Sequence, residues 1–173
     1  MASNAPLIVY VDFKSPYAYV AKDPTRSLAD ELGIDVDWRP LTLDIPSFLG
    51  SARLGARDEV IESHRSSDQW AWVRYAYRDA RRYGSLRGLV VRGTTKIWDS
   101  SLAAIGMLWA KAQGAEILRR YMDTVFERFW KRELDIEDVA VIEAVLREAG
   151  ARSDGFRAHA VGEGRAAHDA EQR

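Results

Sequence analysis

The chain has 173 residues, of which 47% are apolar and 29% are charged, and this size and balance are typical of one globular domain. Its 25 basic and 26 acidic residues give a net charge of −1, so the overall charge predicts neither a nucleic-acid partner nor binding to an anionic membrane. Cysteine is absent, which excludes disulfides, thiolate metal ligands and any reaction in which the protein itself supplies the sulfur.

No segment has the composition of a targeting or membrane-spanning sequence. The first apolar run, residues 7–11, is too short for a signal peptide, and no later run approaches the roughly 20 apolar residues of a membrane span. We therefore expect a cytoplasmic protein. His64, His159 and His168 are scattered without the spacing of a ligand set, so we expect surface histidines and no metal site.

The first forty residues predict a strand, a helix and a second strand. Residues 7–11 are apolar and β-branched, which is typical of a buried strand. Ser15 can cap the following helix and Pro16 suits its first turn, while Pro24 is expected to kink or divide it. Residues 34–39 alternate between apolar and charged, as a strand does. The three elements predict a βαβ unit with parallel strands and a right-handed crossover.

The rest of the chain predicts helices, because nothing after Pro40 alternates for long enough to indicate another strand. Helices are expected after Ser67-Asp68, after Asp99-Ser100, after Gly114 and from Asp135, with one or two weaker helices beyond Ser153. The second of these has an apolar stripe from Leu102 to Ala112, and the third a wide apolar face from Leu118 to Trp130.

Two details of these helices can be checked directly. The helix predicted after Ser67-Asp68 should pack through one face, formed by Trp72, Val73, Ala76, Ala80 and Tyr83. Asp135, with Asp138 three residues later, forms a variant of the capping box. Two parallel strands make a poor sheet, so we expect that further strands escaped detection or that the rest of the sheet lies outside this chain.

The order strand, Ser15-Pro16-Tyr17, helix and strand, followed by a helical insertion, resembles the DsbA-like branch of the thioredoxin superfamily. It is most similar to 2-hydroxychromene-2-carboxylate isomerases and kappa-class glutathione transferases. The similarity rests on residues 12–17, on residues 75–84, and on Asp99 with the helix 102–109. It implies an α/β thioredoxin-like fold with a βαβ portion at 1–40, an all-helical DsbA-type insertion at 41–162 and the start of a returning helix at 163–173.

The resemblance also implies a role for Ser15. The related oxidoreductases carry Cys-x-x-Cys at this turn, whereas Ser15 and Ala18 occupy those positions here. In the isomerase and transferase branch, the serine hydroxyl donates a hydrogen bond to the thiolate of bound glutathione, and the helix N-terminus lowers the thiol pKa. Ser15 would then be catalytic and, with Pro16, would bind glutathione. The alternative is that Ser15 only caps the helix and Pro16 only starts it.

Two functions follow as hypotheses. The first is a glutathione-dependent isomerase or transferase that acts on small aromatic or conjugated carbonyl compounds, with Tyr17 and Tyr19 either lining the substrate pocket or packing in the core. The second is an inactive DsbA-like scaffold that binds a small hydrophobic ligand or a protein partner. The family suggests a homodimer.

Two departures from the family weaken the enzyme hypothesis. All five prolines lie within the first 46 residues, so none can match the family's cis-proline, which contacts glutathione. Its Asp-Ser pair for the γ-glutamyl group also has no counterpart here.

The segment 70–96 has a local excess of positive charge, with seven basic residues and one acidic residue interleaved with tyrosines. Such a patch can contact phosphates or an anionic substrate, and a nucleic-acid site is the weakest version of this hypothesis. The alternative is a solvated helix face, because Arg74, Arg78 and Arg81 recur at helical spacing.

Overall fold

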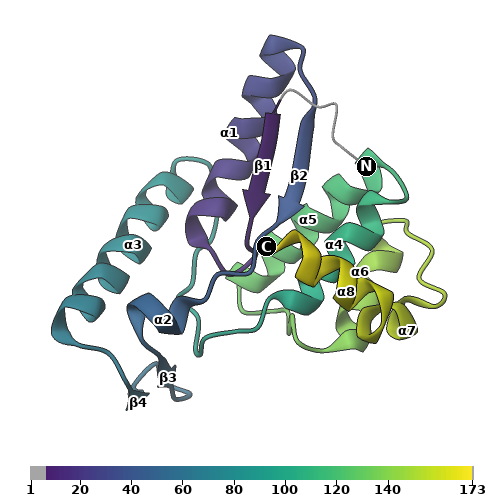
Figure 1. The fold of residues 1–173 in the computed structure, drawn as a ribbon. Coiled ribbons are helices and arrows are strands. Elements are labelled where there is room, and N and C mark those ends of the chain that lie inside the picture. Colours follow the sequence, from purple (N-terminus) through teal and green to yellow (C-terminus); the bar gives the residue numbers. More distant parts are fainter. Residues whose placement is uncertain (1–6, 173) are drawn as a thin grey trace.

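The computed structural model describes residues 7–172 and confirms the predicted βαβ unit (Figure 1). Strand β1 (Leu7–Val11) leads through helix α1 (Pro16–Leu32) into strand β2 (Val36–Pro40). The two strands pair in parallel, with Val9 opposite Trp38. Their shared direction brings both carboxyl ends to the same edge as the N-terminus of α1.

Helix α1 is continuous through Pro24, which corrects the expectation of a divided helix. Proline has no N–H, so the carbonyl of Val20, four residues earlier, has no intrahelical donor. Arg87 replaces that donor, because its Nη2 lies 2.6 Å from the Val20 carbonyl oxygen. A side chain 67 positions away therefore satisfies the backbone where the proline leaves it open.

Three short elements that the sequence did not predict follow β2. Helix α2 (Ile45–Leu49) precedes an antiparallel hairpin made of β3 (Ala52–Leu54) and β4 (Val60–Ser63). All four residues of β4 are exposed, and β3 has only three residues. In β3 only Ala52 is buried and in β4 no residue is, so neither strand is long enough or covered enough to show the apolar alternation by which strands are predicted.

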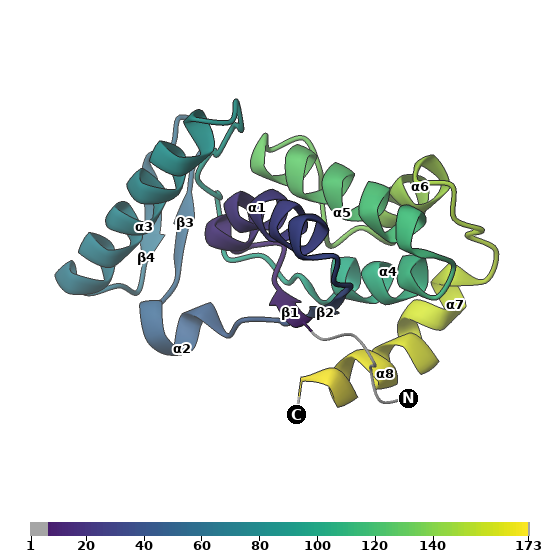
Figure 2. The ribbon, with the colours of Figure 1, turned by 90° about the horizontal axis from the view of Figure 1, so that it is seen from above.

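Six helices complete the described chain, and the predicted helix-rich α/β architecture is confirmed. Their bounds are α3 (Ser67–Ser85), α4 (Ser101–Lys111), α5 (Ala115–Trp130), α6 (Val139–Glu148), α7 (Phe156–Val161) and α8 (Glu163–Glu171). Seen from above, β3, β4 and α3 lie on one side of the βαβ unit and α4 to α7 on the other (Figure 2). None of the helices within residues 7–172 combines the length and the apolar character that crossing a membrane requires.

The packing face of α3 is narrower than its sequence predicts. Val73 and Ala80 are buried, but Trp72 and Tyr83 are 65% and 46% exposed. The helix begins with a capping box in which Ser66 accepts from the Gln69 N–H and the Gln69 side chain accepts from the Ser66 N–H. Only one narrow stripe of α3 therefore contacts the rest of the protein.

The predicted cap of α6 is shifted by three residues. Asp138, rather than Asp135, is the N-cap, and its Oδ1 accepts from the Ala140 N–H at 2.7 Å. Asp135 instead accepts from the Glu137 N–H in the preceding turn. Both aspartates stabilise backbone donors, but the helix starts at the second of them.

The core forms where α5 passes beneath the turn between β1 and α1, and the predicted burial of α5 is confirmed. Phe13 packs against Phe126, and Tyr19 stacks on both Phe126 and Trp130. The indole Nε1 of Trp130 donates to the Phe13 carbonyl at 3.1 Å. The backbone just before Ser15 is thus fixed by a helix whose inner face is fully buried.

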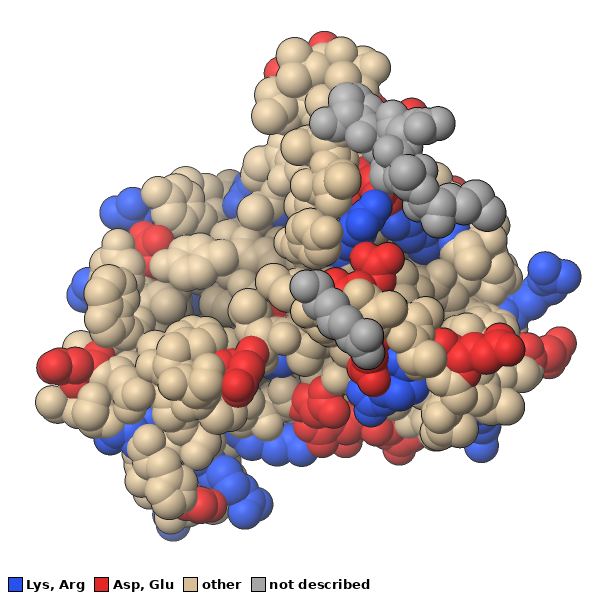
Figure 3. Space-filling model, viewed as in Figure 1, with Lys and Arg blue, Asp and Glu red and all other residues tan. Residues whose placement is uncertain are grey.

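Charged side chains of both signs are scattered over the face shown in Figure 3, most of which is formed by uncharged residues. This mixture agrees with a net charge near zero.

Within residues 7–172, the parallel sheet consists of β1 and β2 alone. Helix α8, which begins where the sequence predicts the returning segment, packs against β2.

Candidate functional site

Ser15 is the N-cap of α1. Its backbone is extended, with φ −87° and ψ 116°, and its Oγ accepts from the Ala18 N–H at 3.3 Å. Pro16 occupies the first helical position, where a missing N–H costs nothing. The capping role of both residues is therefore present in the structure. Accepting this bond leaves the hydroxyl proton of Ser15 free to donate to a ligand.

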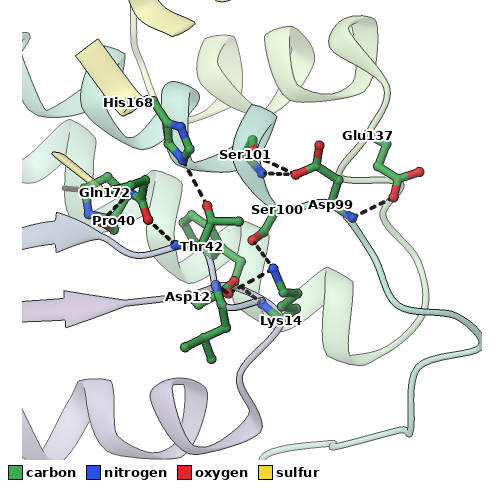
Figure 4. Close-up of polar contacts among 12 residues, drawn as sticks. Asp12, Lys14, Pro40, Thr42, Asp99, Ser100, Ser101, Glu137, His168 and Gln172 are labelled. Carbon is green, nitrogen blue, oxygen red and sulfur yellow. Dashed lines mark hydrogen bonds and ion pairs between the residues drawn. The ribbon is translucent and has the colours of Figure 1, made fainter. Parts of the chain in front are cut away.

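Lys14, which precedes Ser15 in the chain, forms a buried ion pair with Asp12 (Figure 4). The Lys14 ammonium is 3.1 Å from Asp12 Oδ2 and 3.1 Å from Ser100 Oγ, and both Asp12 and Lys14 are more than nine-tenths buried. Asp12 also accepts from the backbone N–H groups of Lys14 and Leu43. These bonds tie the β1–α1 turn to the N-terminus of α4 and to the segment after β2.

The N-terminus of α4 is held in turn by Asp99. Its Oδ1 accepts from both the N–H and the hydroxyl of Ser101, while its own N–H donates to Glu137. Burial raises the pKa of Asp99, but the two hydrogen bonds from Ser101 and the charges of Arg165 and Lys14 together outweigh it, so the pKa lies below its usual value. The carboxylate is therefore held in its charged, accepting form.

His168 is buried, which corrects its predicted surface position. Only 3% of it is exposed, because α8 lays it against the segment that follows β2. Its Nε2 is 2.9 Å from Thr42 Oγ1, and Gln172 bonds both the Thr42 N–H and the Pro40 carbonyl (Figure 4). Helix α8 thus closes the carboxyl end of β2.

Across residues 7–172 no three His, Asp or Glu side chains are grouped as metal ligands.

The two tyrosines of the first turn have different surroundings. Tyr17 is 40% exposed and donates to Asp79 of α3 at 3.1 Å. Tyr19 is 2% exposed, and burial raises its pKa to about 12. Neither lines the cavities described next. Tyr19 is therefore a packing residue of the core, where a substrate does not reach its ring. Tyr17 bridges α1 and α3 at the surface.

A small cavity of about 90 Å³ adjoins the N-terminus of α1. Lys14 and Pro16, the neighbours of Ser15, line it, and Ser15 itself does not. The remaining wall is mostly apolar and comes from α2, α3 and the loop before α4, with Leu49, Ala76 and Trp98 among its residues. The cavity places an apolar surface beside the cap of α1.

A second cavity, of about 530 Å³, shares part of that wall, including Tyr77 and Lys96. Arg74, Arg78 and Arg81 of the predicted basic face all line it. The three arginines are exposed, as the solvated-face interpretation expects, and they also border a concave surface.

Sequence reasoning missed several of these residues. Ser100 is 86 positions from Lys14, and nothing local links them. Arg65 also lines both cavities, but it lies outside the basic segment that the charge count singled out. The only local sign of a role for Arg65 is that it precedes Ser66, the N-cap of α3.

Comparison with known proteins gives one positive result. A search of curated proteins found no match. The family model described as the DSBA-like thioredoxin domain matches residues 6–171, nearly the whole chain. The βαβ unit, the serine at the start of α1 and the helices that follow agree with that match. The chain therefore belongs to the family of DSBA-like thioredoxin domains.

Proposed function

We propose that this protein is a glutathione-dependent isomerase or transferase that acts on small aromatic or conjugated carbonyl compounds. The family suggests thiol-disulfide or glutathione-related catalysis. Because the chain has no cysteine, a thiol must come from a bound molecule. The observation that carries the proposal is Ser15, which caps α1 and keeps a hydroxyl proton to donate.

The residues at this turn suit a thiolate. The Tyr17 N–H lies in the first turn of α1, where helix geometry supplies no intrahelical acceptor. The positive end of the helix dipole lies at the same place as this N–H, and both favour the anionic form of a thiol. Glutathione supplies a nucleophilic thiolate when it is bound, and Ser15 would hold that sulfur by hydrogen bonding. The adjoining apolar cavity, lined by Pro16, would exclude water from one side of the sulfur.

Isothermal titration calorimetry with reduced glutathione tests this proposal. We expect Ser15→Ala to weaken binding by about tenfold or more, the loss typical of one hydrogen bond to a charged group. The variant should also raise the thiol pKa of bound glutathione, which the ultraviolet absorbance of the thiolate reports.

Ser66→Ala is the matched control, because Ser66 caps α3 in the same way and lies outside the proposed thiolate site. It should lose stability as Ser15→Ala does, but keep the affinity for glutathione. If wild type binds no glutathione, or if both variants bind it equally well, the proposal is wrong.

The scaffold hypothesis keeps a specific observation in its favour. The Ser15 Oγ is already engaged with the Ala18 N–H, and the wall beside it is mainly apolar. A protein that binds a small apolar dye in this cavity, displaceable by apolar ligands and indifferent to glutathione, would be such a scaffold. Cytoplasmic location and a homodimer stay predictions from the sequence.

A further inference from the structure

The larger cavity is bounded by the β3–β4 hairpin, by α3 and by the loop 93–97. Its volume of about 530 Å³ lies within the usual range of small-molecule sites. Six cationic side chains line it and only one carboxylate, that of Asp58, does so. These cations are Arg65, Arg74, Arg78, Arg81, Lys96 and Arg132.

Two of these six charges are neutralised by the protein. Lys96 Nζ is 2.5 Å from Glu137 Oε2, and Arg132 Nη1 is 2.6 Å from Asp58 Oδ1. The other four, all arginines, form no ion pair with any carboxylate among residues 7–172. The cavity therefore holds a surplus of about four positive charges in a protein whose net charge is −1.

Arg65 shows this surplus most clearly. Its Nε is buried without a hydrogen-bond partner, and burial lowers the pKa of its guanidinium. The guanidinium lies 4.9 Å from the centre of the Trp70 ring. Stacking on an aromatic ring orients the group, but it does not supply the acceptor that a desolvated N–H requires. An anion in the cavity would supply one.

The three arginines of α3 strengthen the case. Residues 74, 78 and 81 lie three or four positions apart on one helix, and like charges at this spacing destabilise it. Arg81 is held in place by its bond to the Val91 carbonyl and lies over the Tyr77 ring. A row of guanidinium groups without carboxylate partners around a cavity, one of them held in place, suits two or more carboxylate or phosphate groups.

The remaining wall indicates what such a ligand carries besides charge. Trp70, Val73, Tyr77 and Ile97 contribute aromatic and aliphatic surface to the same cavity. A planar or apolar body can contact these side chains while its anionic groups face the arginines. A purely inorganic ion would leave that surface unused.

We propose that this arginine-lined cavity binds a small organic polyanion, an apolar or aromatic compound that carries at least two negative charges as carboxylate or phosphate. The proposal stands apart from glutathione at Ser15, because none of its steps requires a thiol. The two cavities share a wall, so the bound ligand would lie next to the smaller cavity that adjoins the N-terminus of α1.

Calorimetry of the full chain with three probes tests the charge requirement. The probes are benzoate with one charge, isophthalate with two carboxylates, and phenyl phosphate with a dianionic phosphate at mildly alkaline pH. We expect isophthalate or phenyl phosphate to bind at least about tenfold more tightly than benzoate, which corresponds to one additional charge-assisted contact. The tighter of the two dianions identifies carboxylate or phosphate as the preferred group.

Matched arginine variants on one helix test the location. Arg78→Gln removes an exposed cavity arginine, and Arg82→Gln removes an arginine of the same helix that does not line the cavity. We expect the first to weaken dianion binding by about tenfold and the second to leave it nearly unchanged. Arg65→Gln should weaken binding as well, and circular dichroism checks that all three variants fold.

Several results would overturn the proposal. These are equal affinity for benzoate and both dianions, no binding of any probe, or equal losses in Arg78→Gln and Arg82→Gln. Tighter binding of a short oligothymidylate than of either dianion would instead make the surface a nucleic-acid site. If glutathione fails to bind while a dianion binds as expected, the function proposed for Ser15 fails and this inference stands.

Discussion

At the scale of single residues, Gly106 and Tyr121 show how closely the helical half is packed. Tyr121 is fully buried and its hydroxyl donates to the Ala103 carbonyl at 2.8 Å. Burial raises the pKa of this hydroxyl well above its usual value. A Cβ on Gly106 would overlap the hydroxyl and lie 2.9 Å from Ile142 Cγ2. No flexible side-chain end is available to move aside.

Gly106→Ala should therefore lower the free energy of unfolding by about 1–3 kcal/mol, the usual cost of overpacking a core. Gly93→Ala is the control, because its new Cβ would meet only the Arg81 Nη2, at an ordinary 3.6 Å. Urea unfolding followed by circular dichroism measures both changes. Equal stabilities of the two variants would show that the α4–α5 contact adapts more easily than its distances indicate.

Residue roles could be predicted from the sequence only where the partner is close in the chain. Ser15 could be predicted as a cap because its acceptor role is completed three residues later, at Ala18. The bond between Lys14 and Ser100 could not, since it depends on how α4 docks. The same holds for Arg65, whose burial is set by the hairpin and α3 together.

At the scale of elements, Asp123 joins α5 to α1. Its Oδ1 is 2.8 Å from Lys22 Nζ and 2.6 Å from Arg26 Nη1. Burial raises the pKa of Asp123, but the hydrogen bonds and charges of these two cations outweigh it and lower the pKa. A carboxyl whose pKa is lower in the folded state stabilises the protein above its unfolded pKa, and this contribution is lost as the pH falls through the folded value.

Asp123→Asn should thus lower the melting temperature at neutral pH, and the difference from wild type should shrink below about pH 4, near the unfolded pKa of aspartate. Differential scanning fluorimetry across that range measures the effect. Asp154→Asn is the control, because Asp154 is exposed and forms no ion pair with the described residues. A difference that stays constant with pH would contradict the bridging role of Asp123.

Elements with a strong local pattern were predictable, and those defined by their neighbours were not. The apolar face of α5 is set by its own sequence and does not depend on which elements pack against it. Its burial could therefore be predicted from residues such as Met122 and Val125. The hairpin buries only Ala52, and α3 presents Trp72 to solvent despite its apolar ring. Periodicity indicates which side chains are apolar, but it does not indicate how much of a face another element covers.

At the scale of the whole molecule, burial is distributed unequally between the two sides of the βαβ unit. Helix α5 carries a row of fully buried side chains, whereas the hairpin and most of α3 are exposed. Local opening requires least free energy where few apolar contacts are lost. The side that contains β3, β4 and α3 is therefore the more easily opened part of the protein.

Hydrogen–deuterium exchange with mass spectrometry measures this difference. Peptides from α5 should exchange most slowly, close to the rate of global unfolding, and peptides from β4 most quickly. A polyanion bound in the arginine-lined cavity should slow exchange in the hairpin and leave α5 unchanged. A hairpin as protected as α5 in the free protein would indicate that the two sides open together.

The hydrogen bond from Arg87 to the Val20 carbonyl, which Pro24 leaves without a donor, has an evolutionary consequence. Arg87 donates to a backbone oxygen that would already have a donor if residue 24 were any amino acid other than proline. The contribution of Arg87, which lies in the turn after α3, thus depends on which residue occupies position 24 of α1. The two positions are epistatic: a lineage that replaces Pro24 releases Arg87 to vary, whereas one that loses Arg87 first must accept an unpaired carbonyl inside α1.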